Sequence, residues 1–226
     1  MRTRITNIIL TPGVTEERHI PFLPDAEVLI DGNRIVYADK REGAPAFEAE
    51  QTIDGNGALA MPGLCNMHTH TPMTLLRSVG SDLTLERWLN DAIFPVEKHL
   101  TDECVRAGSD LGVMEMLRYG TTSFNDMYMH MDQVAQSALD GGMRAMLGYG
   151  IVDFNGDCHD FPPALELYEK WGRHPSGRIR VAEVLGMQAL GAAVGVGLGA
   201  LFVSTTAVHG RLAAAIVVLL TLAGGI

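Results

Sequence analysis

Between residues 64 and 181 the sequence alternates strand-like and helix-like segments, and this alternation constrains the fold more than any other feature. The predicted strands are 64–68, 121–125, 144–151 and 178–181, and the predicted helices are 83–94, 101–118, 131–139 and 163–171. Strands separated by helices form parallel sheets with crossover helices. Four such units amount to half of an eight-stranded TIM-type (β/α) barrel, whose functional residues lie at the carboxyl ends of the strands. We therefore expect an α/β fold that contains a partial barrel.

The helix at 101–118 has the strongest pattern of the four. Its apolar residues recur every three or four positions, at Cys104, Ala107, Leu111, Met114 and Leu117. Thr101 can cap its start, and Gly120 lies just past its end.

The first 60 residues carry a different pattern, in which short strand-like runs are separated by turn residues. Strands are expected at 5–10, 27–30, 34–38 and 58–61. The run Asp31-Gly32-Asn33 separates the second strand from the third and is typical of a tight hairpin. Residues 1–60 are therefore predicted to form a small β unit.

Charge and cysteine content exclude several classes of protein. The formal net charge is -10 and no run of Lys or Arg is present, whereas nucleic-acid binding calls for clustered basic residues. The three cysteines, Cys65, Cys104 and Cys158, form no CxxC pair, which argues against a disulfide framework and a cysteine zinc site. The apolar run at 8–10 is far shorter than the core of a signal peptide. These features predict a cytoplasmic protein that does not bind nucleic acid.

Composition changes sharply near Glu183. After this residue the sequence contains one charged side chain, that of Arg211. Residues 185–208 are free of charge, and the segment is long enough to cross a membrane as a helix. The alternative is a buried strand-helix pair of a soluble core. We expect residues 182–226 to form a hydrophobic helical tail, with membrane contact through 185–226.

The stretch MPGLCNMHTHTPM, residues 61–73, places two histidines one residue apart at the end of the first predicted barrel strand. In a strand, residues i and i+2 point to the same side. His68 and His70 can therefore converge on one metal ion with bonds of about 2.0 to 2.1 Å. The alternative is a pair of loop histidines without a role, because the HxH pattern alone is not specific.

The residues around this pair resemble the amidohydrolase superfamily. The resemblance is carried by MPGLCNMHTHTPMTLLRSVGSDLTLERWL, IFPVE, MEMLRYGTTSFNDMY and GMRAMLGYGIVD. The sequence is most similar to the 5-methylthioadenosine/S-adenosylhomocysteine deaminases and related chlorohydrolases, over residues 1–181. The resemblance implies a β-sandwich built from both chain ends, and residues 1–60 would form part of it. It also implies a barrel, and residues 61–181 would form its first half. It also implies one Zn²⁺ or Fe²⁺ ion and hydrolysis of C–N or C–Cl bonds on purine or triazine rings.

The resemblance assigns roles to three residues. His68 and His70 match the first two metal ligands of the family, and Glu97, at the end of IFPVE, matches a glutamate that accepts hydrogen bonds from ribose hydroxyls. In such enzymes the metal activates water and a carboxylate passes the proton to the departing ammonia. The family's later histidines, glutamate base and aspartate have no counterpart after Val181. No catalytic residue is therefore assigned, and this chain is expected to be an incomplete form that is inactive alone.

Other polar residues are weaker candidates. Asn125 and Asp126 follow the second barrel strand, where they could orient a ligand histidine or cap the next turn. His130 and His159 are expected to be solvated loop residues. Tyr149 stands where some family deaminases carry an arginine that contacts the substrate, which leaves the preferred substrate open.

Three functions remain open at this point. The first is a metal-dependent aminohydrolase of an adenosine-like substrate such as 5-methylthioadenosine or S-adenosylhomocysteine. The second is another reaction on the same scaffold, of the triazine chlorohydrolase or guanine deaminase type, and the third is a non-catalytic, membrane-associated protein that keeps half of the fold. A small nucleoside-like molecule is the expected substrate. The open strand edges of a half barrel favour pairing with another chain, including a homo-oligomer.

Overall fold

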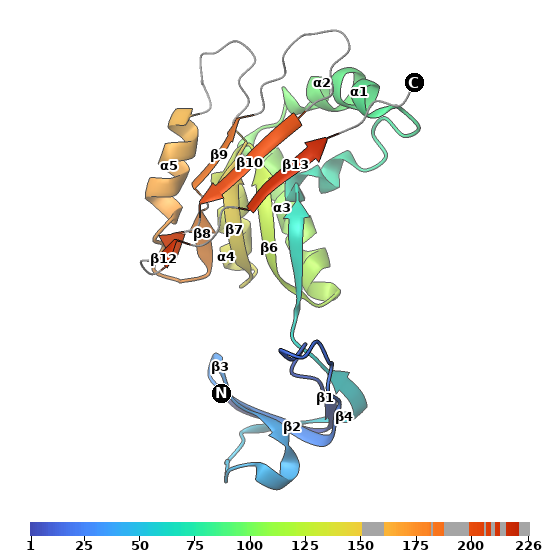
Figure 1. Ribbon diagram of the computed structural model, residues 1–226, viewed down its shortest axis with the longest axis vertical. Helices are drawn as coiled ribbons and strands as arrows, with labels where there is room; N and C mark the ends of the chain where they lie inside the picture. Colours follow the sequence, from blue (N-terminus) through green and yellow to red (C-terminus); the bar gives the residue numbers. More distant parts are fainter. Residues whose placement is uncertain are drawn as a thin grey trace. The chain divides into compact units, whose positions relative to one another are not determined.

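The computed structural model describes residues 1–150, 161–181, 183–187, 199–205, 207–208, 211–212 and 216–221, with side chains at 1–150 and 162–181. The chain divides into two compact units, Met1–Gly63 and Leu64–Ile226. Each unit has its own sheet (Figure 1). Each also has its own hydrophobic core.

The first unit is built on a four-stranded sheet. Its strands are β1 (Arg2–Leu10), β2 (Leu23–Asp31), β3 (Arg34–Lys40) and β4 (Gln51–Ala60), and the short 3-10 helix η1 (Arg41–Gly43) follows β3. The order is β3-β2-β1-β4, with β4 parallel to β1 and the other neighbours antiparallel. Gly32 and Asn33 close the predicted hairpin, and Gly32 has a φ of 61°, which glycine adopts without strain.

The second unit contains a parallel sheet with its strands in chain order. The strands are β5 (Leu64–Thr69), β6 (Thr121–Tyr128), β7 (Arg144–Tyr149) and β8 (Ile179–Val181). The helical segments between them are η2 (Thr71–Leu76, 3-10), α1 (Leu85–Arg87), η3 (Trp88–Ile93, π), α2 (Phe94–Glu97), α3 (Asp102–Arg118), α4 (Met131–Asp140) and α5 (Phe161–Trp171). The predicted α/β class and parallel sheet are confirmed. Because the strands are parallel, the residues that follow each of them gather at one end of the sheet.

Helices α3, α4 and α5 pack against the sheet and share one apolar core with it (Figure 1). The strands contribute Phe124, Leu147 and Ile179, each at most 2% exposed. The helices contribute Val105, Val113, Val134, Ala135, Ala138, Leu167 and Trp171. Burial of a large apolar side chain contributes about 1.5–3 kcal/mol, so this core stabilises β6, β7 and β8 against the helices.

The face that helix α3 buries is not the apolar face that its sequence pattern predicts. Met114 and Leu117 of that predicted face are exposed. The buried residues are Val105, Gly108, Ser109, Gly112 and Val113. A Cβ on Gly108 would lie 2.4 Å from the carbonyl oxygen of Pro72, and one on Gly112 would lie 2.4 Å from Cγ2 of Thr71. The two glycines therefore allow α3 to approach η2 more closely than larger residues would.

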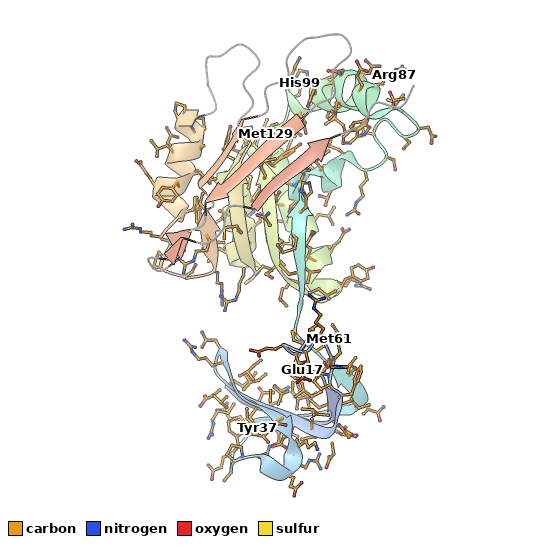
Figure 2. The ribbon with its side chains drawn as sticks, in the orientation of Figure 1. Glu17, Tyr37, Met61, Arg87, His99 and Met129 are labelled. Carbon is orange, nitrogen blue, oxygen red and sulfur yellow. The ribbon has the colours of Figure 1, made fainter. Side chains whose placement is uncertain are left out.

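The helix predicted at 83–94 is a continuous series of α1, η3 and α2 that extends to Glu97. Its middle is π-helical, a geometry that is frequent at functional sites. Figure 2 labels Arg87 on α1, His99 just past α2, and Met129 directly after β6, and all three lie at the same end of the second unit. The series therefore ends with Glu97 at the carboxyl end of the sheet.

The segment after Val181 does not form the predicted helical tail where the structure describes it. Strands β9 (Glu183–Met187), β10 (Gly199–Thr205) and β13 (Ile216–Thr221) form an antiparallel sheet, and β11 (Ala207–Val208) pairs with β12 (Arg211–Leu212). The helical prediction is wrong for these residues, because an apolar run predicts burial rather than helix and β13 is rich in β-branched residues. Across the part of the chain that the structure describes, every helix is too short or too polar to cross a bilayer. The rest of the predicted tail, including 188–198, lies outside the described residues.

Candidate metal and substrate site

The two histidines of the HxH pair lie at the carboxyl end of β5. His68 is the penultimate residue of the strand, and His70 is the first residue after it. Their rings meet edge to face, with centres 5.0 Å apart and planes at 84°. Two imidazoles bound to one tetrahedral zinc ion through bonds of about 2.05 Å have their ring centres about 5.2 Å apart. The separation of the two rings therefore fits a shared metal ion.

A backbone carbonyl orients His70. Its Nδ1 lies 2.5 Å from the carbonyl oxygen of Met127 in β6. A carbonyl oxygen only accepts, so Nδ1 donates the proton, and Nε2 of the neutral ring keeps its lone pair for a metal. Metal-binding histidines are usually held in this way. Sequence reasoning considered Asn125 and Asp126 for this role, but the side chain of Asn125 donates to the carbonyl of Met67 at 3.1 Å.

Asp126 is a buried carboxylate beside the histidine pair. It is 2% exposed, and both of its oxygens accept from the backbone N–H of Thr71, at 3.1 and 3.3 Å. Burial raises the pKa of Asp126 to about 6, against the lowering effect of hydrogen bonds from Thr71 and Met127 and of the charge of His68. Asp126 therefore links β6 to the first residue of η2, which directly follows His70.

Tyr128 connects Glu97 to the same end of the sheet. Tyr128 is the last residue of β6, is 7% exposed, and donates its hydroxyl to Oε1 of Glu97 at 2.6 Å. Its ring centre lies 6.0 Å from that of His70. Burial first, and then the Glu97 carboxylate, raise the pKa of the Tyr128 hydroxyl, so it stays a proton donor. Sequence reasoning missed Tyr128, although its place at the end of the second barrel strand was a signal that could have found it.

The remaining predicted residues take other positions. His130 is partly exposed, and its Nδ1 lies 2.6 Å from Oδ1 of Asp102, so it is not simply solvated. Tyr149 ends β7 and stands in register with Tyr128. His159 lies outside the described residues.

The histidine pair could supply two metal ligands. Among the residues that the structure describes, no group of three or more His, Cys, Asp or Glu side chains is arranged to hold a metal ion. Catalytic zinc sites normally have three protein ligands and a water. His68 and His70 alone would therefore not complete such a site, and further ligands would have to join them.

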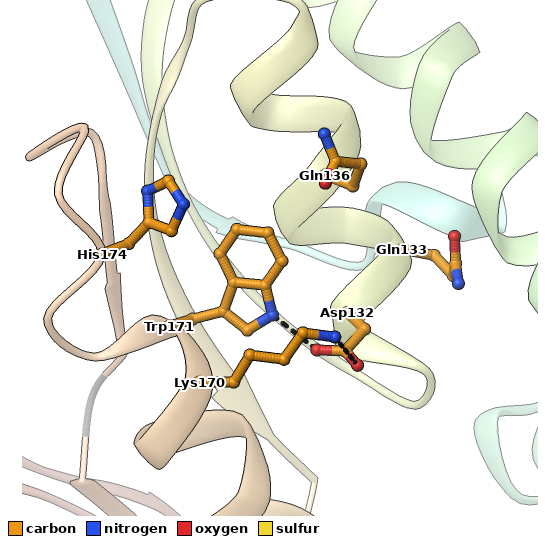
Figure 3. Close-up of a pocket in the computed structure, with 6 residues that line it drawn as sticks. All are labelled: Asp132, Gln133, Gln136, Lys170, Trp171 and His174. Atoms are coloured by element: carbon orange, nitrogen blue, oxygen red, sulfur yellow. Dashed lines mark hydrogen bonds and ion pairs between the residues drawn. The ribbon is translucent and has the colours of Figure 1, made fainter.

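A separate cavity of about 410 Å³ lies between α4 and the end of α5 (Figure 3). The Asp132 carboxylate accepts from the indole N–H of Trp171 at 2.5 Å and from Nζ of Lys170 at 2.7 Å. The ring of His174 stacks on Trp171 with centres 5.0 Å apart. These contacts use the polar groups of the cavity to join α5 to α4, which indicates a structural role.

Comparisons of the sequence and the fold with known proteins find amidohydrolases and deaminases among the similar proteins. The model of the family described as "Amidohydrolase family" matches residues 59–210, beyond Val181 where the likeness of the motifs ends. A 5-methylthioadenosine/S-adenosylhomocysteine deaminase of Thermococcus kodakarensis is 48% identical over 128 residues, which are 57% of this chain and 30% of the relative. A 5'-deoxyadenosine deaminase of Methanothermobacter thermautotrophicus is 48% identical over 159 residues, which are 69% of this chain and 36% of the relative. The crystal structure of an adenosine deaminase from Xanthomonas campestris with bound zinc has a TM-score of 0.69 and 34% identity, covering 80% of this chain and 42% of that one. The chain thus spans about a third of the length of the curated relatives that it matches.

Proposed function

The chain belongs to the amidohydrolase family, and from this premise we propose that it is the metal-binding portion of an aminohydrolase that deaminates an adenosine-like nucleoside, such as 5-methylthioadenosine or S-adenosylhomocysteine. The observation that carries the proposal is the edge-to-face pair of His68 and His70, with His70 fixed through Nδ1. The relatives named as deaminases of adenosine-type nucleosides support the substrate class.

His68 and His70 would hold the divalent ion, Zn²⁺ or Fe²⁺. The chemistry that such an ion supplies when bound is a water nucleophile at neutral pH, because the ion lowers the pKa of water. His70 would bind the ion through Nε2, because its Nδ1–H donates to the carbonyl oxygen of Met127. The related adenosine deaminase structure contains bound zinc, which supports a metal ion as cofactor.

Glu97 would bind the sugar of the nucleoside. One of its oxygens accepts from Tyr128, which leaves Oε2 to accept hydrogen bonds from ribose hydroxyls. Glu97 is partly exposed, so a ligand can reach it. The Glu97 carboxylate and the histidine pair lie at the same end of the sheet. One nucleoside could therefore place its sugar at Glu97 and its purine ring near the metal ion.

Metal binding provides the first test. The full chain is dialysed against Zn²⁺, its metal content is measured by mass spectrometry, and its affinity is measured by competition with a chromophoric chelator. We expect about one ion per chain, and a loss of affinity of at least about tenfold for His68→Ala and His70→Ala. His99→Ala, which removes an exposed histidine outside the pair, serves as the matched control and keeps the wild-type affinity. Unchanged affinity of the His68→Ala/His70→Ala double variant would refute the metal site.

The reaction is tested with a panel of substrates. A complete, metal-loaded version of the protein, which includes the further metal ligands, is incubated with 5-methylthioadenosine, S-adenosylhomocysteine, guanine and a chlorotriazine, and ultraviolet absorbance and released ammonia or chloride are followed. The proposal expects the inosine-type product from the first two compounds. Turnover of guanine or the triazine alone would assign a different reaction to the same scaffold.

A further inference from the structure

We propose that Tyr128 is a positioning residue for substrate binding, whose hydroxyl holds the Glu97 carboxylate so that its second oxygen meets the vicinal ribose hydroxyls of the nucleoside. This inference rests on the proposed function, because it assumes that Glu97 binds the sugar. It adds a residue to the site and gives a physical reason for the orientation of the carboxylate.

The contact is long-range and well defined. Tyr128 and Glu97 are 31 residues apart in sequence and belong to β6 and α2, and their oxygens lie 2.6 Å apart. Tyr128 is held in place by its ring, which packs in the buried core, and by its backbone, which pairs within the sheet. A side chain held in this way has one orientation in which its hydroxyl can donate. It therefore restricts Glu97, which lies on a helix of four residues.

The position of Glu97 in its helix also indicates that its carboxylate needs a hydrogen-bond donor. Glu97 is the last residue of α2, at the end of the helical series where the helix dipole is negative and a carboxylate is disfavoured. Among the described residues, the hydrogen bond that the Glu97 carboxylate receives comes from Tyr128. A hydrogen bond to a charged acceptor is about twice as strong as a neutral one. The tyrosine hydroxyl thus stabilises a carboxylate at a position that the helix disfavours.

Tyr128 also places Glu97 relative to the histidine pair. Its ring centre lies 6.0 Å from that of His70, and the same strand supplies the Met127 carbonyl that orients His70. One strand end therefore fixes both the metal ligand and the sugar-binding carboxylate. The spacing between the two groups, which a nucleoside has to span, is set by β6.

The alternative is a core tyrosine that satisfies its hydroxyl on a nearby carboxylate, with no effect on ligand recognition. The two roles differ in one measurable property. A positioning residue alters the discrimination between ligands that have and lack the ribose hydroxyls. A merely structural residue alters the affinity for both ligands equally.

The experiment uses the zinc-loaded full chain and two unreactive probes, inosine and 2',3'-dideoxyinosine, whose dissociation constants are measured by titration calorimetry. The wild type is expected to bind inosine with a dissociation constant about tenfold or more lower than that for 2',3'-dideoxyinosine, because a hydrogen bond to a charged group contributes a free energy of this size. Tyr128→Phe is expected to bring the ratio close to one, as Glu97→Gln does, and the double variant should show no further change. Tyr119→Phe, at a tyrosine that is 74% exposed, and Glu86→Gln, at an exposed glutamate, are the matched controls and should keep the wild-type ratio.

The outcomes separate this inference from the proposed function. If Tyr128→Phe weakens both probes equally, or leaves the ratio unchanged while Glu97→Gln abolishes it, Tyr128 is not a positioning residue and the proposed function stands. If the wild type binds neither probe, or shows no preference for inosine, the sugar-binding role of Glu97 is refuted and this inference falls with it. Thermal unfolding of every variant verifies that the fold is intact.

Discussion

Replacement of Gly108 by alanine tests whether the close approach of α3 to η2 holds the histidine pair in place. The added Cβ would lie 2.4 Å from the carbonyl oxygen of Pro72 and 3.0 Å from its Cα. Both are backbone atoms, so no side-chain rotation relieves the contact. Overpacking of this kind costs about 1–3 kcal/mol, and alanine regains about 1 kcal/mol of helix propensity over glycine. Because the contact is severe, we expect the free energy of unfolding to fall by about 1–2 kcal/mol.

Urea denaturation measures this loss, and a Zn²⁺ competition titration measures its effect on the site. Pro72 follows His70 by two residues, so a shift of η2 should also weaken metal binding. Gly112→Ala is the comparison variant, because it lies in the same helix and its closest neighbour is a side-chain atom, Cγ2 of Thr71, rather than a backbone atom. It should be less destabilising than Gly108→Ala. A Gly108→Ala protein as stable as the wild type would show that η2 yields to the helix and would refute the reasoning.

Two further predictions concern polar contacts. Thr101 accepts from the N–H of Cys104 at the start of α3, so Thr101→Ala should lower the free energy of unfolding by about 1 kcal/mol in urea denaturation; Thr84→Ala, at an N-cap without such a bond, should have a smaller effect. Arg106 donates to Asp140 and lowers the pKa of that carboxyl, so this contact stabilises the fold above the ordinary aspartate pKa and is lost as pH falls through the lowered value. Arg106→Gln should therefore reduce stability slightly at neutral pH and not in strong acid, and the same reduction at both would contradict this assignment.

The sequence predicted the elements of both units well. The strand predicted at 121–125 became β6, and the helices predicted at 101–118 and 131–139 became α3 and α4 with ends displaced by one residue. These elements are specified by local signals, which are apolar periodicity, capping residues and turn glycines. The helical prediction failed for the residues after Val181 that the structure describes, because an uncharged apolar run carries no such signal and suits a strand as well as a helix.

Much of the candidate site depended on contacts that local signals do not specify. His68 and His70 could be found from their spacing, because it follows from the geometry of one strand. The partner of His70 could not, since the Met127 carbonyl lies 57 residues further along the chain and a backbone carbonyl has no signature in the sequence. The face that α3 buries was also hidden, because Gly108 and Gly112 matter through the backbone that approaches them.

The sequence by itself determined the order of strands and helices between residues 64 and 181, the placement of two histidines at a strand end, and the family resemblance. Each of these follows from short runs of neighbouring residues. The tertiary structure alone decided which ring nitrogen of His70 is left for a metal and how Tyr128 meets Glu97. The physical reason is that a hydrogen bond depends on distances of about 3 Å between atoms, and such distances between remote residues are fixed only when strands pair and helices pack.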